Sequence, residues 1–226
     1  MSAPRKICAV VPIKDTAQAK QRLAGILSAA QRRSLALAMA EDVLETLASV
    51  CELAGIVVVT VDPAAAAIAA RHGARVSNDG ARAGHTVAVA AAAQRLAAEG
   101  FDMLALPGDI PLVEPDDIVR LLAAHQAAPA FTIVPARDQM GSNAVLSSPA
   151  DAVPLRFGNN SFLPHLDAAK ARGIAPLVLR PTRIGLDIDT PEDLALFRKT
   201  PSRTRARALL DRWDTDLAAE LGKATA

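Results

Sequence analysis

The sequence predicts an α/β fold in which a mostly parallel sheet lies between two layers of helices. Short runs rich in Val and Ile alternate with longer Ala- and Leu-rich segments of helical periodicity. Buried parallel strands are continuous apolar runs, and the helices that connect them cover both faces of the sheet. The chain has 226 residues, of which 51% are hydrophobic and 22% charged, which suits one full core and excludes a disordered chain.

The first half of the chain follows this alternation closely. Strands are expected at residues 7–13, 55–61, 74–77 and 103–106. Helices are expected at residues 29–50, 63–72, 85–99 and 115–125. The boundaries have local causes: Asp62-Pro63 closes a strand and opens a helix, and Gly73 suits the end of that helix.

After residue 128 the pattern changes to an α+β order. Strands are expected at residues 130–135, 144–146 and 176–179, with helices at 163–172 and from Pro191. The polar loop at 137–143 is too short for a helical crossover between the strands beside it. The second half is therefore predicted to be a small α+β insertion at the edge of the sheet, within one domain spanning residues 1–200.

Residues 201–226 are expected to form a basic amphipathic helix at the C-terminal end. Its apolar residues recur at helical spacing and follow three arginines: Arg203, Arg205, Arg207, then Leu209, Leu210, Trp213, Leu217 and Leu221. A helix docked back on the body with a solvated basic edge is the favoured interpretation. Contact with a partner, including a second copy in a homodimer, is the alternative.

The composition excludes several classes of partner. The net charge is +1, and the chain has no Tyr, one Trp and five Phe, so both a basic surface and stacking rings for nucleic acid are missing. No apolar run is long enough to cross a membrane, and residues 1–6 lack a signal-peptide pattern. Cys8 and Cys51 are expected to be buried thiols in a reducing compartment. A cytoplasmic protein is expected.

Ligands of an open parallel sheet bind at the carboxyl ends of its strands, so the residues that follow strands are the main candidates for ligand binding. The first strand leads through Pro12 to Lys14, and Lys20 and Arg22 follow. Three cations placed there suit a polyanion such as a triphosphate, although a solvated basic turn is the alternative. The pattern GxxxxGK[ST] is absent, which argues against a P-loop enzyme.

Three acidic residues follow other strands. Asp109 lies in Pro-Gly-Asp-Ile-Pro, directly after a predicted strand. Asp187 and Asp189 alternate with Ile188 on an extended segment, so they share one face about 7 Å apart. Helix capping from Thr190 onward accounts for the acids that follow but not for these two. Such a set of hard oxygen ligands predicts Mg²⁺ held together with substrate phosphates.

Three further loops could bind anions or a base. The loop at 79–86 opens a helix whose free N–H groups could meet a nucleobase edge or a phosphate, and capping alone is an equal alternative. The loops at 141–144 and 156–162 contain Gly, Ser and Asn and could form amide nests for small anions. Turn chemistry could account for either of them.

In this order, the segments VPIK, AKQRL, PGDIP, GSNAV, RFGNNSF…H and DIDTPEDL resemble the guanylyltransferases of coenzyme F420 biosynthesis over about residues 7–199. That family couples GTP to 2-phospho-L-lactate, phosphoenolpyruvate or 3-phospho-D-glycerate and releases pyrophosphate. PGDIP and DTPEDL are shared with many sugar-nucleotide transferases, whereas FGxxSF after GSNA is typical of this family. The resemblance implies a Rossmann-like, GT-A-like nucleotidyltransferase fold and a product passed to a downstream F420-pathway transferase.

The resemblance also assigns roles to residues. It implies that Asp109 and Asp187 hold Mg²⁺, with Asp189 nearby. It implies that Lys14, Lys20 and Arg22 act in catalysis on the triphosphate. The nucleotide site it implies is lined by Pro12, Lys14, Lys20, Arg22, Gly84, His85, Thr86 and Asp109. The acceptor site it implies consists of Asn143, Gly158 and Ser161.

One segment departs from the family pattern, because Gly84-His85-Thr86 stands where the family often has Leu-Asn-Thr. Guanine is expected to be held there by backbone and polar edges, since the chain is poor in aromatic residues. The amide-rich loop at 158–161 favours 3-phospho-D-glycerate among the acceptors.

Three other functions remain open from the sequence. The first is a nucleotidyltransferase of the same fold that acts on a sugar phosphate or a molybdenum-cofactor precursor. The second is a nucleotide-binding regulatory module without catalysis. The third is a nucleic-acid binder that uses the Arg-rich tail.

Overall fold

The computed structural model describes residues 6–158 and 160–224, with side chains described as far as Asp214. Its strands are β1 (Ile7–Pro12), β2 (Leu53–Val59), β3 (Arg75–Ser77), β4 (Asp102–Ala105), β5 (Ala130–Pro135), β6 (Ser142–Ser148) and β7 (Leu177–Val178). Its helices are α1 (Ala29–Ala48), α2 (Pro63–Arg71), α3 (His85–Ala98), α4 (Pro115–Ala124), α5 (Phe162–Ala171), α6 (Thr182–Gly185), α7 (Pro191–Lys199) and α8 (Arg205–Ala224). Short 3-10 turns lie at Thr16–Gln18, Gln21–Leu23 and Ala81–Ala83.

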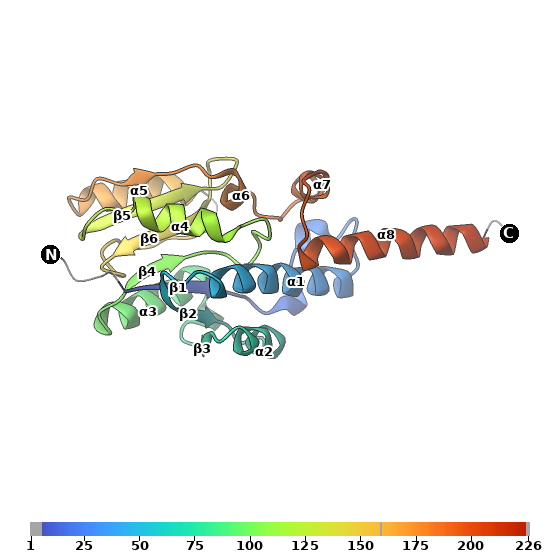
Figure 1. Ribbon diagram of the computed structural model, residues 1–226, viewed down its shortest axis with the longest axis horizontal. Helices are drawn as coiled ribbons and strands as arrows, with labels where there is room; N and C mark the ends of the chain where they lie inside the picture. Colours follow the sequence, from blue (N-terminus) through green and yellow to red (C-terminus); the bar gives the residue numbers. More distant parts are fainter. Residues whose placement is uncertain (1–5, 159, 225–226) are drawn as a thin grey trace.

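The strands form one seven-stranded sheet in the order β3-β2-β1-β4-β6-β5-β7, which runs from the bottom to the top of Figure 1. The pairs β1–β2, β1–β4, β2–β3 and β5–β7 are parallel, whereas β6 is antiparallel to both β4 and β5. The mostly parallel sheet and the α+β insertion at its edge are therefore confirmed. Because β6 runs antiparallel to β4, β6 begins at the edge where β4 ends.

Helices cover both faces of the sheet, because the strands are apolar on both sides. On β1, Ala9 and Val11 pack in one core cluster with α1, α2 and α4. Val10 and Cys8 face the opposite side and pack in a second cluster with α3. A further cluster joins α5 to β5 and β6. The predicted three-layer architecture is confirmed.

Two expectations about local structure are wrong in detail. Strand β6 extends two residues further at each end than predicted, because Ser142, Ser147 and Ser148 pair with β5 and Ser147 also pairs with β4. Cys51 is exposed rather than buried, because α1 ends at Ala48 and the cysteine falls in the turn before β2. Cys8 is buried as expected.

Helix α8 begins against α1 and then extends beyond the rest of the chain (Figure 1). The buried carboxylate of Asp42 on α1 accepts hydrogen bonds from the backbone N–H groups of Arg205 (2.7 Å) and Ala206 (3.0 Å). Ala206 and Leu210 are fully buried in a cluster with Phe197 of α7. The first half of the tail helix is thus docked on the body, while Leu217 and Leu221 lie outside the described side chains.

Replacing Leu210 with Ala is expected to lower the free energy of unfolding by about 2–4 kcal/mol, because the substitution leaves a cavity between α1, α7 and α8. Urea denaturation measures the loss. Leu209→Ala is the matched control, since Leu209 is only partly buried and should cost clearly less. Equal losses in the two variants would contradict a tail docked through Leu210.

In the part of the chain described by the structure, no helix combines the length and the apolar character needed to cross a membrane.

Candidate active site at the carboxyl edge of the sheet

The loop after β1 brings Lys20 and Arg22 to the carboxyl edge of the sheet. The loop is tied to the end of β2, because the buried carboxylate of Asp62 accepts a hydrogen bond from the backbone N–H of Thr16 at 2.9 Å. Lys20 itself has a left-handed backbone, with φ at 52°. Non-glycine residues rarely adopt this conformation, and where they do the strain is often found at a functional site.

Lys20 lies between two of the predicted acidic residues. Its Nζ is 2.5 Å from Oδ2 of Asp109 and 3.6 Å from Oδ1 of Asp189. The loops that carry these acids are joined, since the backbone N–H of Ile188 donates to the carbonyl of Asp109 at 3.0 Å. Burial alone would lower the pKa of Lys20, but the carboxylates, Asp109 first, hold that pKa above its ordinary value. Lys20 is therefore a buried, charged ammonium.

Asp187 completes the acidic group. Burial raises the pKa of Asp187, and the nearby charge of Asp109 raises it further. The side-chain amide of Asn143 donates to Asp187 Oδ1 at 3.0 Å and to the carbonyl of Ile184 at 3.0 Å. Asn143 thus fixes the orientation of the Asp187 carboxylate.

The acidic group fits a magnesium ion bound together with phosphates. Among the described residues, no group of three His, Cys, Asp or Glu side chains is arranged to hold a metal ion without ligands from elsewhere. Mg²⁺ ordinarily uses only one or two carboxylates and takes its other ligands from water and substrate phosphates. Burial is the main cause of the raised pKa of Asp187, and the charge of Asp109 adds to it; a divalent cation would favour the charged form of both carboxylates.

The three predicted triphosphate cations are placed unequally. Arg22 is exposed and pairs with Asp189 at 3.1 Å, so both Lys20 and Arg22 contact the acids directly. Lys14 is also exposed and has no salt bridge to any described side chain. Pro12 is buried at the end of β1. Cations and acids are therefore interleaved at the edge.

The segment Gly84-His85-Thr86 starts α3 beside this edge. Gly84 has φ at 103°, a conformation that side chains disfavour, which explains a glycine there. Burial lowers the pKa of His85 to about 4, with Asp109 raising and Lys14 lowering it, so the ring lies within reach of both charges. The Thr86 hydroxyl accepts from the backbone N–H of Phe157 at 2.9 Å, which links α3 to the 156–162 loop.

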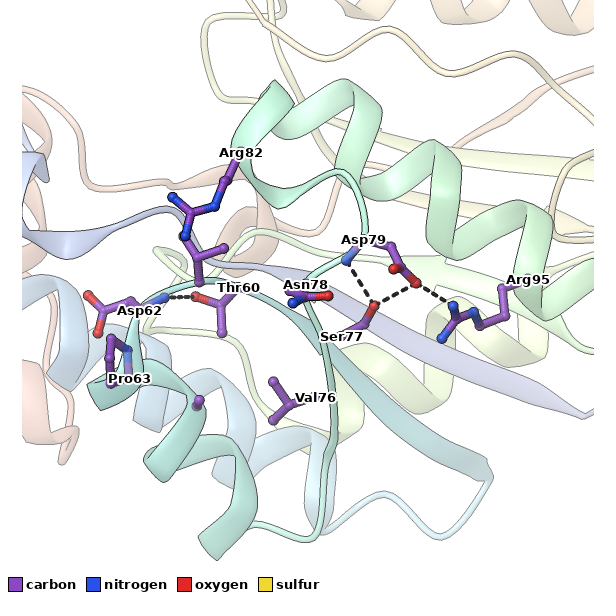
Figure 2. A pocket seen from close by; sticks show the side chains of 11 residues that line it. Thr60, Asp62, Pro63, Val76, Ser77, Asn78, Asp79, Arg82 and Arg95 are labelled. Carbon is purple, nitrogen blue, oxygen red and sulfur yellow. Dashed lines mark hydrogen bonds and ion pairs between the residues drawn. The ribbon is translucent and has the colours of Figure 1, made fainter.

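A pocket of about 480 Å³ lies at the carboxyl ends of β2 and β3 (Figure 2). Asp62 on its wall is saturated by hydrogen bonds from Thr16 and from the start of α2. Asp79 pairs with Arg95 and accepts from Ser77. By contrast, the side chains of Asn78 and Arg82 have no hydrogen-bond or ion-pair partner among the described residues. These two groups are free to bind a ligand.

The predicted acceptor residues occupy different environments. Gly158 is exposed with φ at 126°, and a Cβ there would meet no atom within 4 Å. Ser161 is 2% exposed, and its hydroxyl donates to that of Ser142 at 3.1 Å. Asn143 is 5% exposed and its amide hydrogens are taken by Asp187 and Ile184.

Sequence reasoning missed Asn78 as a site residue, and it included Ser142 only as part of the 141–144 loop. Ser142 is partly exposed at the start of β6, and Asn78 directly follows β3. Asn78 could have been identified in the same way as Asp109, because both are polar residues at the carboxyl end of a strand. Ser142 could have been singled out only by recognising that β6 is antiparallel and so begins at the same edge.

Relatives of known activity match most of the chain. A phosphoenolpyruvate guanylyltransferase of Rubrobacter xylanophilus is 37% identical over 84% of this chain and 92% of its own length. A 3-phospho-D-glycerate guanylyltransferase of Colwellia psychrerythraea is 35% identical, over 83% of this chain and 89% of its own length.

A solved structure agrees with this fold, and a family model agrees with these relatives. A nucleotidyl transferase structure from Methanothermobacter thermautotrophicus has a TM-score of 0.61 at 19% identity, covering 86% of this chain and 96% of that one. At that identity the likeness shows the fold alone. The family model described as "Guanylyl transferase CofC like" matches residues 7–222. The family model and the sequence relatives bear out the resemblance seen in the motifs, and the chain belongs to the family of CofC-like guanylyl transferases.

Proposed function

We propose that this protein transfers GMP from GTP to a small phosphorylated three-carbon acid and releases pyrophosphate, as a step of coenzyme F420 biosynthesis in the cytoplasm. The acceptor is phosphoenolpyruvate, 3-phospho-D-glycerate or 2-phospho-L-lactate. One observation carries the proposal: Lys20, Asp109 and Asp189 meet at the carboxyl edge of the sheet in a chain of the guanylyl transferase family.

The reaction needs no covalent protein nucleophile. An oxygen of the acceptor phosphate forms a bond to the α-phosphorus of GTP, and the bond from that phosphorus to the bridging oxygen of pyrophosphate breaks. The acceptor phosphate is already an anion at neutral pH, so the protein's task is to position two anions and offset their repulsion. Lys14, Lys20 and Arg22 supply positive charge for the departing pyrophosphate.

Asp109 and Asp187 would hold Mg²⁺ in this proposal, with Asp189 nearby. When bound, the ion would neutralise negative charge on the substrate phosphates. The role of Asn143 toward the acceptor is then indirect, because its side-chain amide donates a hydrogen bond to Asp187 and so orients that carboxylate. Gly158, Ser142 and Ser161 are the groups that we propose to lie near the acceptor.

The proposed function is tested by pyrophosphate release over a grid of substrates. GTP, ATP, CTP and UTP are each combined with the three phospho-acids and with a sugar phosphate, in the presence of Mg²⁺. We expect release with GTP and at least one three-carbon phospho-acid, and product trapping with the downstream transferase and mass spectrometry identifies the acid. Release with CTP or UTP and a sugar phosphate only would overturn the proposal.

We place the guanine in the pocket beside β2 and β3, with Arg82 as the residue that binds it. A guanidinium can donate two hydrogen bonds to O6 and N7 of guanine, a pairing that adenine and pyrimidines do not offer. Arg82 has no partner among the described side chains, and Asn78 lines the same pocket (Figure 2).

Arg82→Ala is expected to raise KM for GTP about tenfold to a hundredfold, because one bidentate contact to the base is lost. Steady-state kinetics with GTP and 7-deaza-GTP measure the effect. The deaza analogue lacks N7, so the unmodified protein should bind it more weakly than GTP. The variant has already lost the contact to N7, so it should bind the analogue and GTP about equally. Arg172→Ala, at an exposed arginine outside the pocket, is the control. An equal loss for GTP and ATP in R82A would contradict base recognition by Arg82.

A further inference from the structure

His165 is a buried imidazole that the proposed reaction does not use. It lies in α5, in the motif that runs from Arg156 to this histidine, and it is 0% exposed. The rings of Phe157 and Phe131 lie at centroid distances of 5.1 and 6.3 Å. A ring packed between aromatic neighbours has a fixed orientation, so each of its nitrogens faces one defined partner.

The partners of His165 fix which nitrogen carries the proton. Nε2 is 2.9 Å from the backbone nitrogen of Arg156, which can only donate, so Nε2 must be the acceptor. Burial lowers the pKa of His165 to about 4, so the ring is neutral and carries its single proton on Nδ1. Nδ1 is 3.0 Å from the hydroxyl oxygen of Ser142 and therefore donates to it.

This donation determines what the Ser142 hydroxyl can do. Its oxygen accepts from His165 Nδ1–H and from the hydroxyl of Ser161, which lies 3.1 Å away. A serine oxygen has two lone pairs, and both are then occupied, so Ser142 can act toward a ligand only as a donor. If Nε2 carried the proton instead, Nδ1 would be an acceptor and would take the hydroxyl proton of Ser142. Because the Ser161 proton is donated to Ser142, neither serine would then have a proton for a ligand.

The fold places this donor at the reaction edge. Strand β6 is antiparallel to β4, with Val145 opposite Ala105, so Ser142 lies beyond the end of β4 on the side from which Asp109 projects. The next residue, Asn143, holds Asp187. Ser142 is partly exposed, whereas Ser161 and His165 behind it are buried.

We infer that His165 is a positioning residue for the acceptor: through its Nδ1–H bond it directs the hydroxyl proton of Ser142 toward an anionic oxygen of the phospho-acid. The inference rests on the proposed function. The ligand chemistry is a phosphate or carboxylate oxygen, since the hydroxyl offers a proton and no free lone pair.

Two substitutions separate the two hydrogen bonds of the ring. In His165→Asn the amide lies near the position of Nδ1 and can still donate to Ser142. In His165→Gln the amide reaches the position of Nε2, so the bond to Arg156 is kept and the bond to Ser142 is lost. We expect H165Q to raise KM for the acceptor about tenfold, with kcat and KM for GTP nearly unchanged, and H165N to stay within about threefold of the unmodified protein.

A double-substitution cycle with Ser142→Ala tests whether His165 acts through Ser142. If it does, H165Q has no further effect on acceptor KM once Ser142 is absent. An undiminished effect of H165Q in the S142A background, or equal losses in H165N and H165Q, would overturn the inference. Urea denaturation of all variants separates these effects from a change in stability.

A measurement on the unmodified protein keeps the test independent of turnover. Nitrogen-15 NMR of the histidine rings distinguishes a proton on Nδ1 from one on Nε2, and we expect the Nδ1–H form for His165 at neutral pH. Calorimetric titration with each of the three phospho-acids then compares acceptor binding by H165Q and the unmodified protein. An Nε2–H or doubly protonated ring would overturn the inference even if guanylyl transfer is confirmed, whereas failure of transfer with the expected NMR result would count against the proposed function alone.

Discussion

Asp109→Asn should lower guanylyl transfer about 10³-fold or more while leaving the fold intact. The substitution keeps the size of the side chain but removes the charge that pairs with Lys20 at 2.5 Å and that the proposed Mg²⁺ needs. Each tenfold loss corresponds to about 1.4 kcal/mol of transition-state stabilisation, and losing a metal-binding carboxylate costs several kcal/mol. Pyrophosphate release at saturating GTP and acceptor measures the effect.

Asp116→Asn is the matched control for this prediction. Asp116 is an exposed acid in the first turn of α4, so removing its charge should leave transfer unchanged. Calorimetric titration with GTP shows whether the D109N protein still binds nucleotide. If D109N released pyrophosphate at the unmodified rate, the Asp109 carboxylate would have no part in the chemistry, and its place in the proposed magnesium site would be wrong.

The sequence predicted those parts of the fold that depend on local periodicity. The alternation of Val- and Ile-rich runs with helical segments is a property of each segment by itself, and it predicted the order of strands and helices correctly apart from the short α6. Strand β6 was predicted too short because its serines at 142, 147 and 148 become strand residues only by pairing with neighbouring strands. Cys51 was placed wrongly because the end of α1 was predicted two residues too late.

The acidic residues of the site could be predicted because each follows a strand or extended segment directly in sequence. Their ion pairs could not, since Lys20 and Asp109 are separated by 89 positions and meet only through the fold. The same holds for Asn143, whose contact with Asp187 shows a supporting position that its sequence motif did not reveal. Local sequence patterns therefore identify the charged residues of the site, but only the folded sheet shows which of them form ion pairs.

The second large effect is expected from Lys20→Met, which removes the buried cation between Asp109 and Asp189. Without it, transfer should fall about 10²- to 10³-fold, the cost of losing one preorganised charge at the departing phosphates. Asp109 would lose its ion pair and Asp189 would keep only the one with exposed Arg22, at a place where the lysine side chain is only 8% exposed and little water screens the charges. Lys170→Met, at an exposed lysine of α5, is the control.

K20M also has a consequence for metal binding that runs opposite to its effect on transfer. Lys20 Nζ contacts the carboxylate oxygens that a divalent cation would take, so it competes with Mg²⁺ in the nucleotide-free protein. Removing the lysine should therefore tighten Mg²⁺ binding even as it slows the reaction. A ligand that binds only the folded state raises the melting temperature, so added Mg²⁺ should stabilise K20M more than the unmodified protein. Equal shifts in the two proteins would show that Lys20 and the ion do not share these oxygens.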